Sequence, residues 1–530
     1  MVNDRINIFI FRVQRLQDHF LSKENCLLFH INGTKDYGYN RKKQSDVCSL
    51  NNIILELKNI VGETYIQIKF NEMSTLTLGR NVSLFSPKNV NAIVKPGSIN
   101  EVVQIVHLMN KNNPKLGLHI VSSGYNWGLG SKEPVSEDAI IVILDRLTEI
   151  REINIENGWA IIEPGVTQLN LAKLLKDSSR MLNVTASSGH TSVVGNILER
   201  GVGLRRQRTD DLLGLEVITP DGEKIKVGWW PHAERDTAFN TFGHGPSLLH
   251  LYTQSNLGII TGAVVRLLPR PQKQTVLHLR FLRKKLLGAV NLFRDWYAQE
   301  MVSGVLKIYD TVSTESYGGS VDEHLTLICV SGNHKKVEAT ISILFEEAKD
   351  SGIFTKITHS NEISSDKNDF VLQVVEHAYA GDPTWNEHML RAATGQNANE
   401  VDSKGGGWIF FLAFIPFKGE TIVEALSIID DISNQTGVKI GTTVNALSSD
   451  VIDLVISIKF PPVKNQISKA HEILDLIYEH FTYKGFYPYR LDINHTHFLE
   501  QYYSQTEREV NKKLKSILDP NGIISTGRYF

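Results

Sequence analysis

Cysteine is scarce in this chain: the 530 residues include three, at Cys26, Cys48 and Cys329. They show no CxxC spacing and no neighbouring histidine pattern, so the sequence predicts no zinc site. So few cysteines also argue against a disulfide-built extracellular scaffold. The sequence therefore predicts no metal site in this protein.

Long apolar runs and an excess of one charge are missing too. No stretch of about 20 apolar residues occurs, and Arg12 interrupts the short apolar run at the N-terminus, so neither a membrane span nor a secretory signal is expected. The 56 lysines and arginines nearly balance 58 aspartates and glutamates, for a formal net charge of -2. That balance removes the main electrostatic argument for nucleic acid or an anionic membrane as a partner. We expect a cytoplasmic protein with a small-molecule substrate.

The composition is that of an ordinary globular protein, and the length suits two or more domains. From about residue 86 the chain reads as strand, turn, helix and strand, with Ser98 or Asn100 as the cap of the helix. Asp221-Gly222 predicts a hairpin within 215–228. After residue 272, four apolar strands are each followed by a helix, which predicts an antiparallel sheet covered by helices. The predicted strands are 275–281, 325–332, 408–416 and 451–460, and the helices 286–300, 335–350, 420–437 and 465–481.

Three glycine-containing segments carry the chemical signal of the first half. The first, VSSGYNWGLGSKEP (121–134), follows a β-run, and its glycines let several backbone N–H groups line one concave side, which suits phosphate oxygens. The second (186–217) and third (252–271) combine small, hydroxylated and glycine residues that allow close approach to a flat ligand. Each segment alone could equally be a structural loop. The GxGxxG and P-loop spacings are absent, which disfavours Rossmann and ATPase interpretations.

Taken together, these segments resemble the flavin-binding domain of the vanillyl-alcohol oxidase and para-cresol methylhydroxylase (PCMH) family. The resemblance rests on the loop at 122–130, EPGVT (163–167), GNILERGVG (195–203), the stretch 242–261 and the tail DPNGIISTGRY (519–529). It implies an α+β fold with a two-subdomain PCMH-type FAD-binding domain and an α+β cap whose antiparallel sheet is covered by helices. The implied segments are an N-terminal helix and cover (1–85), the FAD domain (86–272), the cap (273–484) and a return to the FAD domain (485–530).

The resemblance implies FAD as cofactor, a substrate pocket under the cap, and a homodimer as the expected assembly. The residues that it assigns to FAD are Ser122, Ser123, Gly124, Tyr125, Asn126, Trp127, Gly128, Pro164, Gly165, Ser187, Ser188, Gly189, Ser192, Gly195, Asn196, Gly201, Gly258, Ile260 and Arg528.

A tyrosine–arginine pair near the end of the cap is the leading catalytic candidate. GFYPYRLDI (485–493) resembles the family segment that carries such a pair, which gives Tyr489 and Arg490 this role. Arginine stays charged at any accessible pH and tyrosine donates a short hydrogen bond, so both could stabilise a phenolate or a carboxylate. The alternative is a packed tyrosine beside a structural arginine.

Two positions depart from the family pattern. Some members link the flavin covalently through a histidine or tyrosine, and Trp408 falls at or near that position here, so we expect non-covalent FAD. The family's acid/base aspartate is also missing, because Ser187 falls near its place. His190 is the nearby group that titrates close to neutrality and is a candidate base, although a satisfied loop histidine is the simpler interpretation. His244 is expected to be structural.

The expected function is oxidation of a small organic substrate, with a phenol as the first expectation, by hydride transfer from carbon to flavin N5. Oxygen or another acceptor would then reoxidise the flavin. Two alternatives stay open at this point: a low-turnover or non-catalytic flavin-binding protein, and a 2-hydroxy acid dehydrogenase in which Arg490 clamps a carboxylate.

Overall fold

The computed structural model describes residues 50–68, 81–112, 116–231, 241–242, 244–316, 322–360 and 370–529. The chain divides into two compact units, residues 1–51 and 52–530. Residues 1–49 of the predicted N-terminal helix and cover (1–85) lie outside the described residues.

The first sheet of the second unit has four strands in the order β1-β2-β4-β3, in which β4 pairs in parallel with both β2 and β3. Helix α3 (Ile99–Asn112) connects β2 to β3 and buries Val102, Val106 and Met109. Its start is the predicted one, because the Ser98 hydroxyl accepts a hydrogen bond from the Glu101 amide at 3.2 Å. The strands are β1 (Ile66–Ile68), β2 (Val90–Val94), β3 (Leu118–Val121) and β4 (Ala139–Ile143).

A second, antiparallel sheet has the order β5-β6-β10-β8-β9. The predicted hairpin is confirmed, since β8 pairs with β9 across a turn in which Gly222 has φ 91°. The strands are β5 (Ile150–Asn154), β6 (Trp159–Ile162), β8 (Leu212–Ile218), β9 (Lys224–Gly228) and β10 (Ile259–Arg266). Helices α4 (Gln168–Leu175) and α5 (Val193–Leu198) and the short pair β7 (Arg180–Met181) and β11 (Leu268–Pro269) complete this part.

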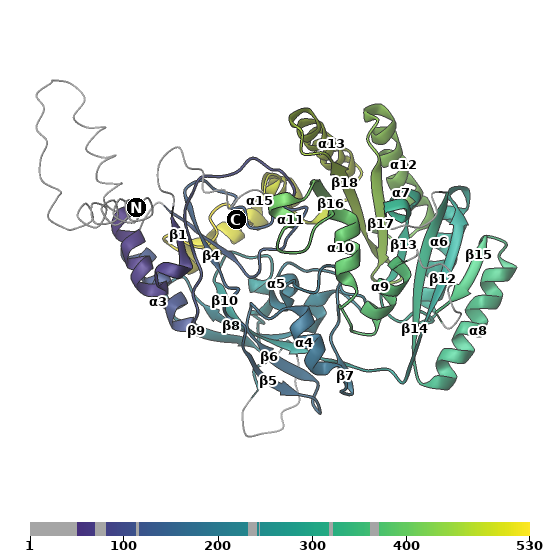
Figure 1. Cartoon of the computed structure of the whole chain (residues 1–530), viewed down its shortest axis with the longest axis horizontal. Helices are drawn as coiled ribbons and strands as arrows, with labels where there is room; N and C mark the ends of the chain where they lie inside the picture. Colours follow the sequence, from purple (N-terminus) through teal and green to yellow (C-terminus); the bar gives the residue numbers. More distant parts are fainter. Residues whose placement is uncertain are drawn as a thin grey trace, which may run out of the picture. The chain divides into compact units, whose positions relative to one another are not determined.

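The third sheet has eight strands in the order β15-β12-β14-β13-β17-β18-β16-β19, and every pairing is antiparallel. Helices α6, α8, α12 and α13 pack on one side of it (Figure 1). The strands are β12 (Lys273–Leu282), β13 (Leu306–Tyr309), β14 (Glu323–Gly332), β15 (Lys356–His359), β16 (Gly407–Pro416), β17 (Ile440–Ala446), β18 (Val451–Phe460) and β19 (Pro488–Arg490). The helices of this half are α6 (Leu286–Ala298), α7 (Thr311–Ser316), α8 (His334–Asp350), α9 (Phe370–Tyr379), α10 (Asn386–Thr394), α11 (Val401–Lys404), α12 (Gly419–Thr436) and α13 (Lys464–Tyr483).

The four predicted strand–helix pairs of this half are confirmed, and four further strands were missed. Three of these, β13, β15 and β19, have at most four residues, which is too short for a period-2 pattern. The fourth, β17, reads IGTTVNA, and its glycine, threonines and asparagine hide a central strand.

Strand β18 shows why the two faces of this sheet differ. Ile452, Leu454 and Ile456 are buried in the apolar core beneath the helices, whereas Asp453 and Val455 line a cavity on the opposite face. Successive side chains of a strand point to opposite faces, so one strand serves both the core and the cavity.

The C-terminal segment returns to the first sheet. The amide of Leu118 donates to the carbonyl of Ile523 at 2.7 Å, and the amide of Ser525 donates to the carbonyl of Leu118 at 2.6 Å. Helices α14 (Leu499–Tyr502) and α15 (Gln505–Leu518) precede this return. The α+β fold class is thus as predicted, and the domain limits at 85, 272 and 484 stay a prediction.

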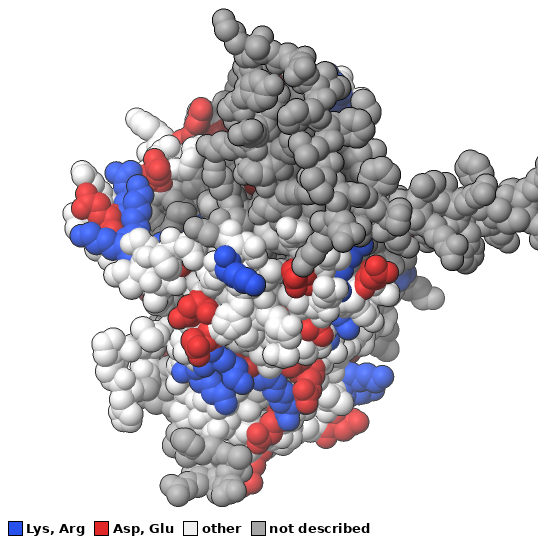
Figure 2. Space-filling model, turned by 90° about the vertical axis from the view of Figure 1, so that its left-hand side faces the viewer, with Lys and Arg blue, Asp and Glu red and all other residues white. Residues whose placement is uncertain are grey.

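Lysine and arginine side chains are interspersed with aspartate and glutamate on the face shown in Figure 2. Such mixing agrees with the near-zero formal charge of the sequence. Among the described residues, no helix has the length and apolar character needed to cross a membrane.

Candidate functional site

A cavity of about 450 Å³ lies within the second unit. Its floor is formed by the loop that follows β3 and by the segment 185–204. Its roof is the face of the eight-stranded sheet opposite helices α6, α8, α12 and α13. The roof residues come from alternate positions of four strands: Lys307, Tyr309, Trp408, Phe410, Leu412, Thr443, Asn445, Asp453 and Val455.

The glycine loop after β3 folds back on itself. The carbonyl of Asn126 accepts hydrogen bonds from the amides of Leu129 at 3.2 Å and Ser131 at 3.0 Å. Gly128 has φ 80°, and a Cβ there would lie 2.2 Å from the ring of Phe410, so the loop requires glycine for both its conformation and its packing. The backbone amides at positions 123–125 donate to no other group of the described chain, which leaves them available to a ligand.

The second segment of the floor is held rigidly from both sides. Ser192 caps α5 by accepting a hydrogen bond from the amide of Gly195 at 2.9 Å, and its hydroxyl donates to the carbonyl of Pro164 at 2.6 Å. From the cap, the side-chain amide of Asn386 donates to the carbonyls of Thr185 at 2.7 Å and Ser187 at 2.6 Å. Helix α10 therefore ties this floor segment to the cap.

These features fit FAD, the cofactor that the sequence predicts. Its two phosphates need backbone or cationic donors, and the amides of the glycine loop and Arg528, which also lines the cavity, provide them. The side-chain oxygen of Asn196 lines the same cavity and is buried without a hydrogen-bond partner among the described residues. A buried polar atom of this kind ordinarily has a partner, which a bound ligand would provide. Loop residues 123–126, Asn196 and Arg528 are therefore the groups that would hold FAD.

Tyr489 and Arg490 lie on β19 and reach the same cavity. The ring of Tyr489 stacks on Phe414 with centroids 4.2 Å apart and planes 3° from parallel. The guanidinium of Arg490 donates from Nη2 to Oδ1 of Asn126 at 2.7 Å. Burial, and next the charge of Asp453, raise the pKa of Tyr489 well above its ordinary value, so this hydroxyl stays protonated.

A row of polar side chains crosses the roof from β13 to β18. The ammonium of Lys307 donates to Oδ1 of Asn445, and Nδ2 of Asn445 donates to Oδ2 of Asp453 at 3.0 Å. The three residues are between 1% and 7% exposed. Burial raises the pKa of Asp453 to about 6, opposed by the Asn445 hydrogen bond and by the charges of Lys307 and Arg490. Burial lowers the pKa of Lys307 to about 8, opposed by Asp453.

The sequence analysis did not predict this row, although two of its residues are charged positions within apolar strand sequences. Asp453 interrupts the otherwise apolar strand VIDLVISIKF, and Lys307 interrupts LKIY. A charge within a buried strand is costly unless it is paired or functional, so such positions mark candidate site residues. What the sequence did not reveal was that the two charges lie on neighbouring parts of one sheet.

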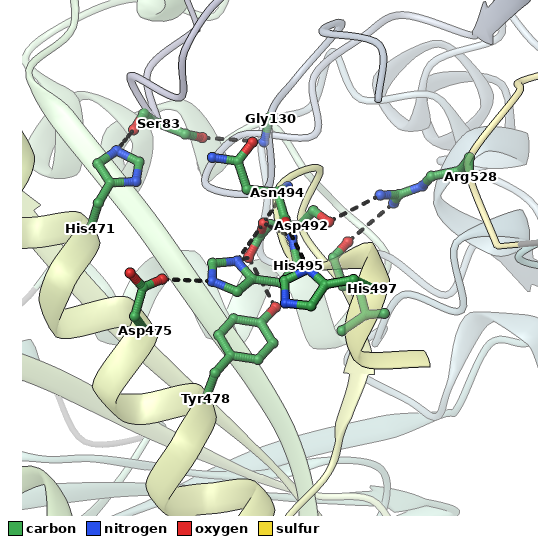
Figure 3. A network of polar contacts seen from close by, with 11 residues as sticks. Ser83, Gly130, His471, Asp475, Tyr478, Asp492, Asn494, His495, His497 and Arg528 are labelled. Carbon is green, nitrogen blue, oxygen red and sulfur yellow. Dashed lines mark hydrogen bonds and ion pairs between the residues drawn. The ribbon is translucent and has the colours of Figure 1, made fainter. Parts of the chain in front are cut away.

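A second polar network holds the loop that follows strand β19 (Figure 3). His495 lies between two carboxylates, with Nδ1 2.8 Å from Oδ2 of Asp492 and Nε2 2.8 Å from Oδ1 of Asp475. The Tyr478 hydroxyl donates to Asp492 at 2.9 Å, and Arg528 donates to the Asp492 carbonyl at 3.3 Å. Burial lowers the pKa of His495, but the two aspartates outweigh it and the net shift is upward. The network joins α13 to the C-terminal tail that carries Arg528.

Most of the predicted site residues meet at the cavity. Its lining includes Ser122, Ser123, Gly124, Tyr125, Asn126, Trp127, Pro164, Ser187, Ser188, Ser192, Gly195, Asn196, Gly258, Ile260, Tyr489, Arg490 and Arg528. The remaining predicted FAD residues do not line it: Gly128, Gly165, Gly189 and Gly201. Two of these four pack closely against lining side chains, Gly128 against Phe410 and Gly201 against Asn196.

Of the other predicted positions, Trp408 lies at the cavity and His190 does not. Trp408 lines the cavity, and its indole donates to the Ser457 hydroxyl at 2.8 Å. His190 is exposed and is not part of the lining, so the structure places the candidate base away from the site. The hydroxyl of Ser187, which the sequence analysis matched to the family's aspartate position, contacts the hydroxyl of Thr185 at 2.6 Å.

Comparison with known proteins identifies the class. A family profile described as an FAD binding domain matches residues 90–228. The fold matches that of p-cresol methylhydroxylase with substrate bound, with a TM-score of 0.81 and 19% identity, over 91% of this chain and 97% of the other. The chain therefore contains an FAD-binding domain and has the fold of p-cresol methylhydroxylase, and both findings support an FAD-linked oxidoreductase with a PCMH-type FAD-binding domain.

The relatives and solved structures similar to this chain carry the names of different activities. The flavoprotein subunit of 4-cresol dehydrogenase (hydroxylating) from Pseudomonas putida is 23% identical, over 83% of this chain and 87% of that protein. A 1'-carboxy-chondrochloren decarboxylase from Chondromyces crocatus is 26% identical, over 91% of this chain and 97% of that protein. A 4-ethylphenol oxidase from Gulosibacter chungangensis matches in structure with a TM-score of 0.79, at 19% identity over 91% of this chain and 97% of the other.

Proposed function

We propose that this protein binds FAD non-covalently and oxidises a small phenolic compound by hydride transfer from carbon to flavin N5. FAD, when bound, supplies the redox chemistry. The observation that carries the proposal is the polar end of the cavity, where Tyr489 and Arg490 lie beside the glycine loop that fits the cofactor. Two relatives named for cresol and ethylphenol support a phenol as substrate.

Different residues of this chain have different roles in the proposed reaction. Arg490, oriented by Asn126, provides a fixed positive charge for the substrate oxygen. Tyr489, held flat against Phe414, provides a hydroxyl that stays protonated. Phe410, Leu412 and Val455 line the apolar part of the roof and exclude water from the reacting carbon.

A carboxylate-bearing substrate is the second candidate, because the roof carries two cations, Lys307 and Arg490, against the single carboxylate of Asp453. The relative named as a decarboxylase of a carboxylated compound supports it. A 2-hydroxy acid dehydrogenase has less support, since the match to a D-2-hydroxyglutarate dehydrogenase spans 35% of this chain. A cytoplasmic homodimer remains a prediction.

The deciding experiment is anaerobic mixing of the FAD-loaded protein with a panel of 4-alkylphenols, hydroxyphenyl carboxylic acids and 2-hydroxy acids. Bleaching of the flavin absorbance by phenols supports the proposal, and bleaching only by acids favours the second candidate. Tight FAD binding with no bleaching by any compound would instead support a non-catalytic flavin protein. Peroxide formed on admitting air distinguishes an oxidase from a dehydrogenase.

A further inference from the structure

Asp453 is a buried carboxylate beside the substrate end of the cavity whose role is unassigned. It is 1% exposed and lines the cavity. Its carboxyl interacts with Tyr489 and Arg490 closely enough to shift the titration of the tyrosine. An inference about its role rests on the proposed function, because it concerns a substrate hydroxyl held by Tyr489 and Arg490.

The hydrogen bonds of Asp453 leave one oxygen free. Oδ2 accepts from Asn445 at 3.0 Å, whereas Oδ1 is buried and has no hydrogen-bond partner in the described chain. Lys307 donates to Oδ1 of Asn445, so Asn445 lies between the ammonium and the carboxylate of Asp453. A buried carboxylate oxygen without a donor is costly, and a proton donor on a ligand would relieve that cost.

The other groups near the cavity are poorer proton acceptors. His190 is exposed outside the lining, and burial keeps Tyr489 protonated. Glu199 accepts from the Tyr529 hydroxyl at 2.5 Å through Oε1, and its Oε2 lies 3.7 Å from the guanidinium of Arg528. Glu133 lines the cavity and its Oε2 also lacks a hydrogen-bond partner among the described residues, but its charge partners are Lys88 and Glu137 rather than the tyrosine–arginine pair.

We propose that Oδ1 of Asp453 accepts the proton of the substrate hydroxyl that Tyr489 and Arg490 hold. The substrate O–H bond breaks, its electron pair stays on the oxygen, and the proton converts the Asp453 carboxylate to a carboxylic acid. The resulting oxyanion faces the guanidinium of Arg490, so the negative charge moves from a buried carboxylate to a position beside a fixed cation. No electron is transferred in this step, and the proton later leaves to solvent.

The charged groups around Asp453 fit this role. The charges of Lys307 and Arg490, on β13 and β19, favour its ionised form, and so does the neighbouring Tyr489 hydroxyl. Burial outweighs them and raises the pKa of Asp453 to about 6, so the carboxylate is ionised and ready to accept a proton at neutral pH. Asp453 thereby takes the place of the aspartate that the loop at 183–192 lacks.

The test uses FAD-loaded protein and a nitrophenol, a phenol that is ionised in mildly alkaline buffer and whose binding is followed by its visible absorbance. Placing this phenolate beside ionised Asp453 requires uptake of about one proton per bound probe. Asp453→Asn should bind the probe with uptake close to zero. Glu133→Gln, which removes the other buried carboxylate of the lining, should keep the uptake of the wild type. Proton uptake is measured by calorimetry in buffers of different ionisation enthalpy.

The outcomes separate this inference from the proposed function. Equal proton uptake in the wild type and Asp453→Asn overturns the role of Asp453 while leaving phenol oxidation intact. A wild type that holds FAD but binds no phenol overturns the proposed function, and this inference with it. With a substrate in hand, Asp453→Asn should lower kcat by about 10²–10⁴-fold and remove the acidic limb of the pH profile. A merely structural role would leave that limb in place.

Discussion

Arg490 on the last strand of the cap donates a 2.7 Å hydrogen bond to the side chain of Asn126 in the glycine loop. The two residues are 364 positions apart in the chain, and this bond connects the substrate end of the cavity to the loop that fits FAD. In the proposed function, this side-chain pair joins substrate recognition to cofactor binding.

The first prediction concerns Arg490. Replacing it by lysine removes the planar fork that grips two oxygens at once, and we expect kcat/KM to fall by about 10–100-fold. If the substrate carries a carboxylate, Arg490→Lys should harm carboxylate substrates more than neutral phenols. Steady-state kinetics on matched pairs, such as an alkylphenol and the corresponding hydroxyphenyl acid, measures the difference. Equal loss on both members of a pair argues against a carboxylate clamp.

The second prediction concerns the glycine loop. Gly128→Ala places a methyl group 2.2 Å from the ring of Phe410 and demands a positive φ, so we expect FAD to bind more weakly by about 1–3 kcal/mol. Titration with FAD, followed by flavin fluorescence, gives the affinity. Gly395→Ala is the matched control, because Gly395 has φ 71° and open space around its Cβ position. The double variant with Phe410→Ala should recover part of the loss, and no recovery would contradict the steric explanation.

The third prediction concerns flavin attachment. Trp408 lines the cavity, and the sequence predicts that it falls at or near the position where some family members link the flavin, a bond that indole does not form. Denaturing the holoprotein and filtering it should release all yellow colour into the filtrate. Flavin that stays with the precipitated chain would show that another residue forms the bond.

The fourth prediction is that Asp453→Asn stabilises the protein at neutral pH. Burial raises the pKa of Asp453 from 3.8 to about 6, so the folded state binds the proton more tightly than the unfolded state and loses stability as pH rises through that window. Asparagine avoids this cost, which is on the order of 2–3 kcal/mol. Denaturant unfolding should show the gain at neutral pH and a shrinking gain toward acid. A destabilised variant at neutral pH would contradict it.

The fifth prediction concerns the network of His495 (Figure 3). Its pKa is raised by Asp492 and Asp475, so its contribution to stability is complete below the ordinary histidine pKa and is lost as pH rises through the folded value. Unfolding measured from about pH 6 to about pH 9 should therefore show a decline in the wild type that is smaller in His495→Gln. Asp475→Asn, which removes the more exposed carboxylate, should reduce the decline in part. Identical pH dependence in all three proteins would exclude the network as its source.

The local pattern of the sequence was enough for the elements that carry strong periodicity or turn chemistry. The hairpin at Asp221-Gly222, the helix that begins after Ser98 and the four long cap strands follow from residue spacing alone. Short-range sterics and hydrophobic burial decide these elements, and both depend on consecutive residues. The FAD-binding class followed instead from the resemblance of the glycine segments, in their order along the chain, to those of the PCMH family, and the family profile supports it.

The tertiary structure decided which polar residues share the site. Lys307, Asn445 and Asp453 lie on three strands that are distant in sequence, and only the strand order β13-β17-β18 places them in one row. His190, close in sequence to the floor, was separated from the cavity because its side chain points to solvent. These side chains meet because strands that are distant in sequence pair in one sheet, and no local sequence pattern encodes that pairing. The sequence by itself therefore determined the cofactor class. The tertiary structure decided which polar groups line the cavity.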